Sequence, residues 1–212
     1  GEALLEAYLV SKEDYLLQAA REVGHALAIG QLVSGGWDYR MEFAPEKRGG
    51  WAYRIDQEKA RRSSRQTEEK PPRDLKNVTT LDDDTTQAAL RFLMKLDTVL
   101  NRKDKRIHAA ADYALAALLK AQYPNGAWPQ RYTEFPAAED FPIKKASYPK
   151  SWPRKHPKAD YHSYYTFNDN TLADLIDTMF LAEQLYDEPR YGAAASKAGD
   201  FILLAQMPEP QP

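Results

Sequence analysis

Apolar positions along the chain fall into pairs of segments with helical spacing, separated by short polar turns or by long irregular stretches. The first segment of each pair lies at 3–9, 84–100 and 170–186. Within these segments apolar side chains recur every three or four residues, which places them on one face of a helix. The short turns "VSKED", "NRKDKR" and "DEPR" join each first segment to a second one. The pattern therefore predicts three helical hairpins and an all-α fold.

The second segments are alike in sequence, so the hairpins are copies of one unit. Each second segment is rich in alanine and ends near a glutamine: Gln31, Gln122 and Gln206. Small residues, which let helices approach closely, stand directly before each glutamine and twelve positions before it. A tryptophan follows six residues after the glutamine in "QLVSGGW" and "QYPNGAW", whereas the third copy reads "QMPEPQP". We therefore expect the chain to be truncated in the middle of a repeat.

The repeat divides the chain into hairpins and loops within one domain. We expect a single all-α domain over 1–212, with repeats near 1–44, 80–135 and 168–212 and long loops at 45–79 and 133–167. In an alternating array the short turns share one face, and the long loops share the other with the N-terminal ends of the first helices. Loops gathered on a rigid scaffold are the usual place for a binding site. The mixed-charge stretch 58–76 is instead expected to be solvated and mobile.

The composition excludes several kinds of function. The chain has no cysteine, so it has no disulfide, no thiolate metal site and no cysteine nucleophile. Its net charge of −2 gives no indication of a nucleic-acid partner or of an anionic membrane surface. No apolar run approaches the ~18 residues that a membrane span needs. His156 and His162 share no helical register, so the sequence does not predict a zinc site.

Two helix starts carry clusters of Asp and Asn at the same place in their repeats. They are "TTLDDDTTQ", with Asp82, Asp83 and Asp84, and "TFNDNTL", which runs from Asn168 to Asn170. One such residue is explained as a helix N-cap, which contributes about 1 kcal/mol. Three in succession exceed that need, and carboxylate and amide oxygens are the ligands that a hard cation such as Ca²⁺ selects. The residues alone leave two interpretations open, a cation site and simple capping.

Many of the aromatic residues lie in the predicted loops. Rings exposed on loops suit stacking on planar or ring-shaped ligands, including sugars. The equally weighted alternative is that each ring packs over the end of a helix. The loop aromatics are Trp37, Trp51, Trp128, Trp152, Tyr161, Tyr164 and Tyr165.

Three motifs in order give the chain a resemblance to a known family. "TLDDDTTQAALRFL", "QYPNGAWPQRY" and "TFNDN" are separated by alanine-rich helices. Over about residues 75–206 this arrangement resembles the family-10 polysaccharide lyases, which are pectate lyases with an (α/α) toroid fold. The resemblance implies a partial toroid and Ca²⁺-assisted β-elimination of polygalacturonate. It also implies that Asp169 binds calcium and that Asp82 and Asp83 are metal ligands or bridge to the substrate, with Asp83 replacing an Asn of the family motif.

The resemblance leads to a specific expectation of function. We expect binding of an acidic polysaccharide with Ca²⁺, in which Trp37, Trp128, Arg131 and Asn168 contact the sugar. No catalytic residue is assigned, because the family uses an arginine base from a region beyond residue 212. A polysaccharide substrate implies a secreted or periplasmic protein. The alternatives are a non-catalytic helical repeat protein that binds glycan or peptide on its loop face, and a structural protein whose acids only cap helices.

Overall fold

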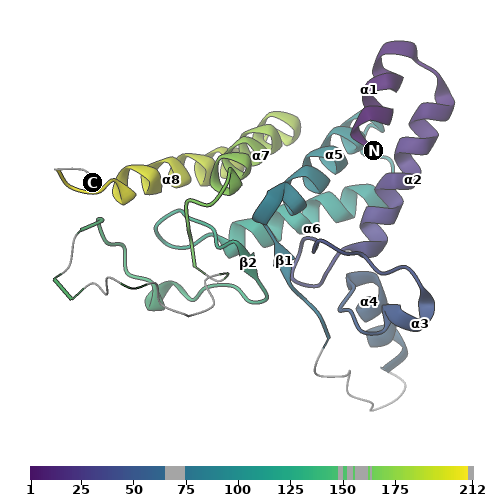
Figure 1. Ribbon diagram of the computed structural model, residues 1–212. Helices are drawn as coiled ribbons and strands as arrows, with labels where there is room; N and C mark the ends of the chain where they lie inside the picture. The colour runs from purple at the N-terminus through teal and green to yellow at the C-terminus, as the bar shows by residue number, and fades with distance from the viewer. Residues whose placement is uncertain (65–74, 148–149, 152–154, 156–161, 163, 210–212) are drawn as a thin grey trace.

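Three helical hairpins form the body of the molecule, as the sequence predicts. The structure is a computed structural model, and it describes residues 1–64, 75–147, 150–151, 155, 162 and 164–209. The hairpins are α1 (Glu2–Ser11) with α2 (Asp14–Gly30), α5 (Thr85–Val99) with α6 (Lys105–Ala121), and α7 (Thr171–Tyr186) with α8 (Pro189–Ala205) (Figure 1). None of the described helices is long and apolar enough to cross a membrane. The prediction of an all-α fold is confirmed.

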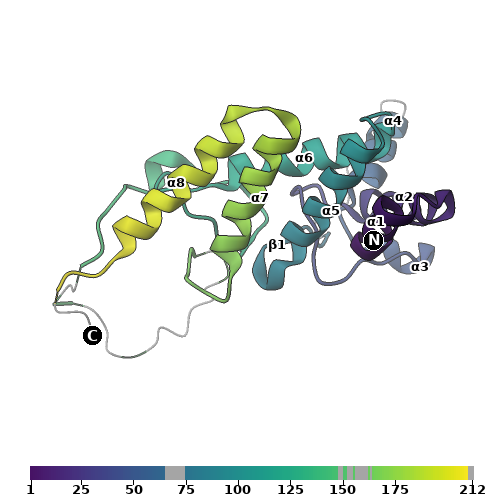
Figure 2. The same cartoon turned by 90° about the horizontal axis from the view of Figure 1, so that it is seen from above.

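The hairpins stand side by side in an arc. The two helices of each hairpin pack on each other, α5 also packs on α7, and α2 also packs on α5 and α6 (Figure 2). Since α5 and α7 run in the same direction, their N-terminal ends lie close together. The described parts of the long connections 31–84 and 122–170 lie at that end of the helices, below the hairpins in Figure 1. We call this side of the molecule the long-loop face.

The long connections contain short elements of their own. Strand β1 (Thr79–Thr80) pairs antiparallel with β2 (Arg131–Tyr132), so the two connections are joined to each other. A 3₁₀ helix, η1 (Asp82–Asp84), leads directly into α5. The other elements are the helix α3 (Pro45–Arg48), the helix α4 (Arg54–Ser64) and a second 3₁₀ helix, η2 (Ala138–Asp140).

Helix α4 corrects the expectation that 45–79 is entirely loop. It lies against α2, and an ion pair of 3.1 Å between Arg54 and Glu58, one turn apart, supports it. Such pairs stabilise a helix even where the composition is strongly polar. Part of the stretch 58–76, expected to be a mobile excursion, is therefore helical up to residue 64, and 65–74 lie outside the described residues.

Glutamine side chains at the ends of α2 and α6 connect successive hairpins. The Nε2 of Gln31 donates to the carbonyls of Gly35 at 2.9 Å and Ala110 at 2.8 Å, and Ala110 belongs to α6 of the next hairpin. Gln122 repeats the arrangement, with bonds of 2.9 Å to Gly126 and 2.8 Å to Ala194 of α8. Each amide thus closes its own turn and fixes the neighbouring hairpin. We call this pair of bonds the glutamine clamp.

The glycine and tryptophan of each turn are explained by the same packing. Gly35 has φ +119° and Gly126 has φ +99°, and a Cβ on Gly126 would lie 2.0 Å from the carbonyl oxygen of Lys197. Glycine is therefore required at that position by both backbone angle and space. The ring Nε1 of Trp37 donates to the Leu27 carbonyl at 2.9 Å, and that of Trp128 to Leu118 at 2.8 Å. The six-residue spacing from glutamine to tryptophan folds each ring back over its own helix.

The clamp predicts a large cost for replacing Gln31 by leucine. Gln31 is fully buried, and the change leaves the carbonyls of Gly35 and Ala110 without their donors. We expect the free energy of unfolding to fall by about 2 kcal/mol or more in urea denaturation. Gln206 occupies the same place after α8 but is exposed, so Gln206→Leu is the matched control, with an expected change below about 0.5 kcal/mol. Equal losses in the two variants would contradict the role of the clamp.

Candidate metal centre

Left-handed backbone conformations shape both helix starts on the long-loop face. Asp83 and Asp84 have φ of 50° and 57°, and Asp169 has φ of 45°. Among residues other than glycine, Asp and Asn adopt this conformation most readily, because their short polar side chains bond locally. The backbone therefore turns sharply at these residues, just before α5 and α7 begin.

Capping does not account for these acids. Asp84 is the N-cap of α5 and Asn170 the N-cap of α7, yet neither side chain accepts a capping hydrogen bond from a backbone N–H of its helix. Asp104, at the start of α6, is a true N-cap, because its carboxylate accepts from the backbone N–H groups of Arg106 and Ile107. The carboxylate of Asp104 thus caps its helix, whereas the side chains of Asp84 and Asn170 make no capping bond.

Asp82, Asp83 and Asp169 converge although 86 to 87 residues separate the two helix starts. One carboxylate oxygen from each lies within 4.8 Å of the others, with Asp82 half-buried and the other two exposed. Oxygens that share one Ca²⁺ at bonds of roughly 2.3–2.6 Å are separated by up to about 5 Å. We call these three residues the acid cluster. The expectation that the acids lie close together is met, and the donor set fits a hard cation.

Asn168 and Arg131 lie next to the acid cluster. The Nδ2 of Asn168 donates to the Oδ1 of Asp82 at 3.0 Å. A guanidinium nitrogen of Arg131 lies 3.9 Å from the Oδ2 of Asp82, and the guanidinium carbon lies 5.2 Å from the ring centre of Tyr39. The pairing of Thr80 with Arg131 between β1 and β2 brings this arginine to the start of η1. Both residues are thus placed where they can contact a ligand of the cluster.

Tyr39 is a site residue that the sequence analysis does not identify. Its hydroxyl contacts the Oδ2 of Asp83 at 2.8 Å and the Oδ2 of Asp82 at 3.1 Å, so one proton is shared between two carboxylates. Burial and the bond to Asp83 raise the pKa of Tyr39 to about 12. The sequence feature that could have identified Tyr39 is its position two residues after Trp37 in "GGWDYR". The anchored tryptophan fixes where the next residues lie.

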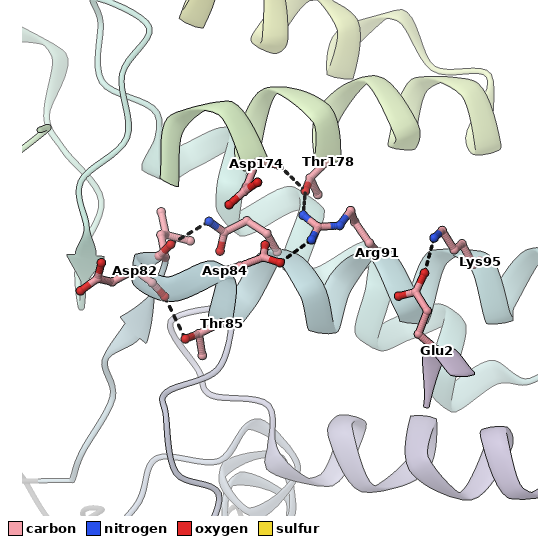
Figure 3. Close-up of polar contacts among 10 residues, drawn as sticks. Glu2, Asp82, Asp84, Thr85, Arg91, Lys95, Asp174 and Thr178 are labelled. Atoms are coloured by element: carbon pink, nitrogen blue, oxygen red, sulfur yellow. Dashed lines mark hydrogen bonds and ion pairs between the residues drawn. The ribbon is translucent and has the colours of Figure 1, made fainter. Parts of the chain in front are cut away.

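Asp84, the third acid of "DDD", has a different partner. Its Oδ2 pairs with Arg91 at 2.5 Å, and Arg91 also donates to the Oγ1 of Thr178 on α7 at 3.0 Å (Figure 3). Figure 3 shows Asp82 at the turn into α5 and Asp84 on the side that faces α7. Three successive acids therefore separate into two that join the acid cluster and one that binds an arginine.

The predicted sugar contacts of Trp37 and Trp128 are wrong. The exposed fraction is 2% for Trp37 and 3% for Trp128, because both rings belong to the core and donate to helix carbonyls. Rings that are open to a ligand come instead from the segment before α7, where Tyr164 is 55% and Phe167 is 62% exposed. The tryptophan and tyrosine at 152 and 161 lie outside the described residues.

Two hollows adjoin this region of the long-loop face. One of about 470 Å³ includes Arg131, and one of about 480 Å³ is mainly aromatic, with Tyr123 shared between them. These volumes lie in the range of small-molecule and sugar sites. The first is lined by Val78, Tyr123, Arg131, Tyr132, Thr133, Glu134 and His162, and the second by Tyr123, Phe141, Tyr164 and Tyr165.

The comparisons with known proteins agree on one family and one fold. The family model described as pectic acid lyase matches residues 45–207. The fold is similar to that of a family 10 polysaccharide lyase from Cellvibrio cellulosa, with a TM-score of 0.52 and 19% identity. It is equally similar, at a TM-score of 0.52 and 18% identity, to an aspartate-to-alanine mutant of that lyase in complex with trigalacturonic acid. No curated protein matched the sequence.

The extent of the structural match matters as much as its score. Each match covers 88% of this chain and 48% of the lyase, so the chain spans about half the length of the solved enzymes. The prediction of a partial helical toroid is confirmed by these matches. The recognition of the polysaccharide lyase family is also confirmed, because the family model covers most of the chain.

The shared proton of Tyr39 yields a prediction for its titration. An ionised Tyr39 would face two carboxylates, so its hydroxyl should keep its proton up to a pH of about 12. The hydrogen bonds are intact below the ordinary tyrosine pKa of about 10 and are lost as the pH rises through the raised value. Ultraviolet difference titration of the wild type against Tyr39→Phe measures this one group. A Tyr39 transition near the ordinary tyrosine pKa would contradict the geometry.

Proposed function

The chain belongs to the pectic acid lyase family, and we propose that it binds an acidic polysaccharide of the polygalacturonate type through Ca²⁺ held by Asp82, Asp83 and Asp169. One observation carries the proposal. Three carboxylates from two distant helix starts converge within 4.8 Å, and two of them, Asp83 and Asp169, stand on left-handed backbones. The matching family model is described as pectic acid lyase, so an acidic polysaccharide is the ligand that we expect such a cation site to bind.

The donor set of the acid cluster favours calcium among the biological cations. Its atoms are carboxylate oxygens, with the Asn168 amide in contact with one of them. No histidine or thiolate takes part in the cluster within the described residues, so zinc and other softer cations lack their preferred ligands. Carboxylates this close repel one another, and a divalent cation removes that repulsion. Two of the three acids are exposed, which leaves room for a sugar carboxylate as a further ligand.

The reaction that such a site serves is β-elimination. When bound, Ca²⁺ supplies positive charge that orients a uronate carboxylate and makes the proton at C5 more acidic. Arg131 lies where its guanidinium can donate two parallel hydrogen bonds to a second carboxylate. Asn168 holds Asp82 in place, and the exposed rings of Tyr164 and Phe167 offer faces to the sugar. A base then takes the C5 proton, a C4–C5 double bond forms as the C4–O bond breaks, and the departing sugar oxygen takes up a proton, which leaves an unsaturated uronate.

The base is not assigned to any of the 212 residues. The resemblance implies an arginine from a further part of the fold, and the chain covers 48% of the solved lyase. We therefore propose binding for this chain, and cleavage only together with such an arginine. Action on a plant polysaccharide would place the protein outside the cytoplasm, either secreted or periplasmic.

The exposed rings support a second candidate, a glycan-binding protein without catalysis. Tyr164 and Phe167 are more than half exposed, and the aromatic hollow lies beside them. Such a surface can hold a sugar chain whether or not a base is present. The two candidates share the ligand and differ only in whether an unsaturated product forms.

Replacement of one cluster acid tests the cation site. Asp169→Asn keeps the left-handed turn, since Asn tolerates it equally well, but removes a negative ligand. In calorimetric titration we expect Ca²⁺ affinity to fall by roughly tenfold or more. Asp187→Asn is the matched control, because Asp187 is also left-handed and ends the same helix at its opposite, exposed end. Equal affinities in the wild type and Asp169→Asn would exclude Asp169 as a ligand.

Incubation with polygalacturonate separates the two candidate functions. Ultraviolet absorbance of unsaturated product that appears with Ca²⁺ and disappears with a chelator indicates the lyase. Retention of the polymer without product indicates a binding protein where the protein tested includes the arginine that the family uses as its base. Product formation that survives the chelator unchanged would contradict a calcium-dependent mechanism for this chain.

A further inference from the structure

Arg91 connects the two helices that carry the acid cluster. It lies on α5, two turns after η1, and its guanidinium reaches toward α7 (Figure 3). One nitrogen pairs with the Oδ2 of Asp84 at 2.5 Å, and the other donates to the Oγ1 of Thr178 at 3.0 Å. A single planar group thus holds the turn before α5 and the side of α7 at the same time.

On the α5 side, Arg91 holds the turn from which two cluster acids project. Asp84 follows Asp83 directly, and both have left-handed backbones. The Oδ1 of Asp84 is buried and makes no hydrogen bond within the described residues. Arg91 is therefore the partner that the structure gives to this carboxylate, and its loss would leave the carboxylate without one. The position of Asp82 and Asp83 depends on the conformation of this turn.

On the α7 side, Arg91 holds the first two turns of the helix that follows Asp169. The Oγ1 of Thr178, which is fully buried, accepts from Arg91 and donates to the carbonyl of Asp174 at 2.6 Å. The carboxyl of Asp174 faces that of Asp84 across the two helices (Figure 3). Burial and the nearby Asp84 raise the pKa of Asp174, and Arg91 opposes that shift. Arg91 thus offsets a repulsion between acids on facing helices.

From these contacts we propose that Arg91 is a positioning residue for the cation site. It fixes the distance between the two helix starts, one of which carries Asp82 and Asp83 and the other Asp169. The inference rests on the proposed function of the acid cluster. Without the guanidinium, Asp84 and Asp174 repel each other across the α5–α7 interface and the helix starts separate. The acids then no longer reach one ion together. Partners of this kind, which hold ligands without touching the metal, typically change metal affinity by 10–100-fold.

The chain provides a matched control one turn further along α5. Lys95 also forms an ion pair across a helix interface, but its partner is Glu2 of α1, on the side away from the acid cluster (Figure 3). Arg91→Met and Lys95→Met each remove one cation from α5 and keep a long apolar side chain. A purely stabilising role would affect the two variants alike, whereas a positioning role affects the cation site only through Arg91.

Terbium luminescence tests the proposal with a readout that stability does not change. Tb³⁺ replaces Ca²⁺ at oxygen sites, and its emission decay in H₂O and D₂O counts the water molecules bound to it. For Arg91→Met we expect Tb³⁺ affinity to fall by roughly 10- to 100-fold. We also expect about one or two additional waters on the ion, in place of carboxylates that no longer reach it. Lys95→Met should leave the affinity and the water count unchanged.

Two further variants keep the test decisive if Arg91→Met folds poorly. Arg91→Lys retains the charge, but its single ammonium cannot hold Asp84 and Thr178 together, so we expect an intermediate loss of affinity. Thr178→Val removes only the α7 contact and should act in the same direction. Circular dichroism and thermal unfolding establish that each variant is folded.

The outcomes distinguish the inference from the proposed function. If the wild type binds no Tb³⁺, the cation site and the role of Arg91 are both overturned. If the wild type binds Tb³⁺ and folded Arg91 variants bind it with the same affinity and water count, only the role of Arg91 is overturned. The same holds if Lys95→Met weakens binding as much as Arg91→Met does.

Discussion

One hydrogen bond from a glutamine amide joins each of the first two hairpins to the next. The amide of Gln31 bonds the Ala110 carbonyl of the second hairpin, and that of Gln122 bonds the Ala194 carbonyl of the third. Because the Gln31 bond is buried and the Gln122 bond is partly buried, a shift of one hairpin along its neighbour would leave polar groups without their partners. The clamp therefore fixes the register of the hairpins, and every feature of the long-loop face is placed relative to that register.

The candidate site is a direct consequence of this register. It places the starts of α5 and α7 side by side, so acids at equivalent positions of two repeats become neighbours. The β1–β2 pairing then adds Arg131, and the loop after Trp37 adds Tyr39. Residues from all three repeats thus contribute to one place on the surface. Each repeat carries its own Asp and Asn pattern, but the acid cluster forms only where the repeats pack together.

The sequence predicts those parts of the molecule that depend on periodicity and on comparison of repeats. The hairpins follow from helical spacing, and the convergence of Asp83 with Asp169 follows from their equivalent positions. Contacts that have no repeated signal are missed, including Tyr39 with Asp82 and Arg91 with Thr178, which join residues 43 and 87 positions apart. Trp37 and Trp128 were misinterpreted as sugar contacts although their shared spacing from glutamine is itself the sign of a structural role. A ring anchored at a fixed distance from a helix end packs on that helix.

The placement of the acids at helix tips has a mechanical consequence. Helices α5 and α7 have 15 and 16 residues, and each is joined to its partner at the opposite end by a short turn. A helix of that length is about 23 Å long, so a tilt of about 5° moves its tip by about 2 Å. Calcium–oxygen bonds tolerate only a few tenths of an ångström, roughly 2.3–2.6 Å. At the proposed cation site, affinity would therefore depend steeply on the angle between the two helices, including changes that begin at their far ends.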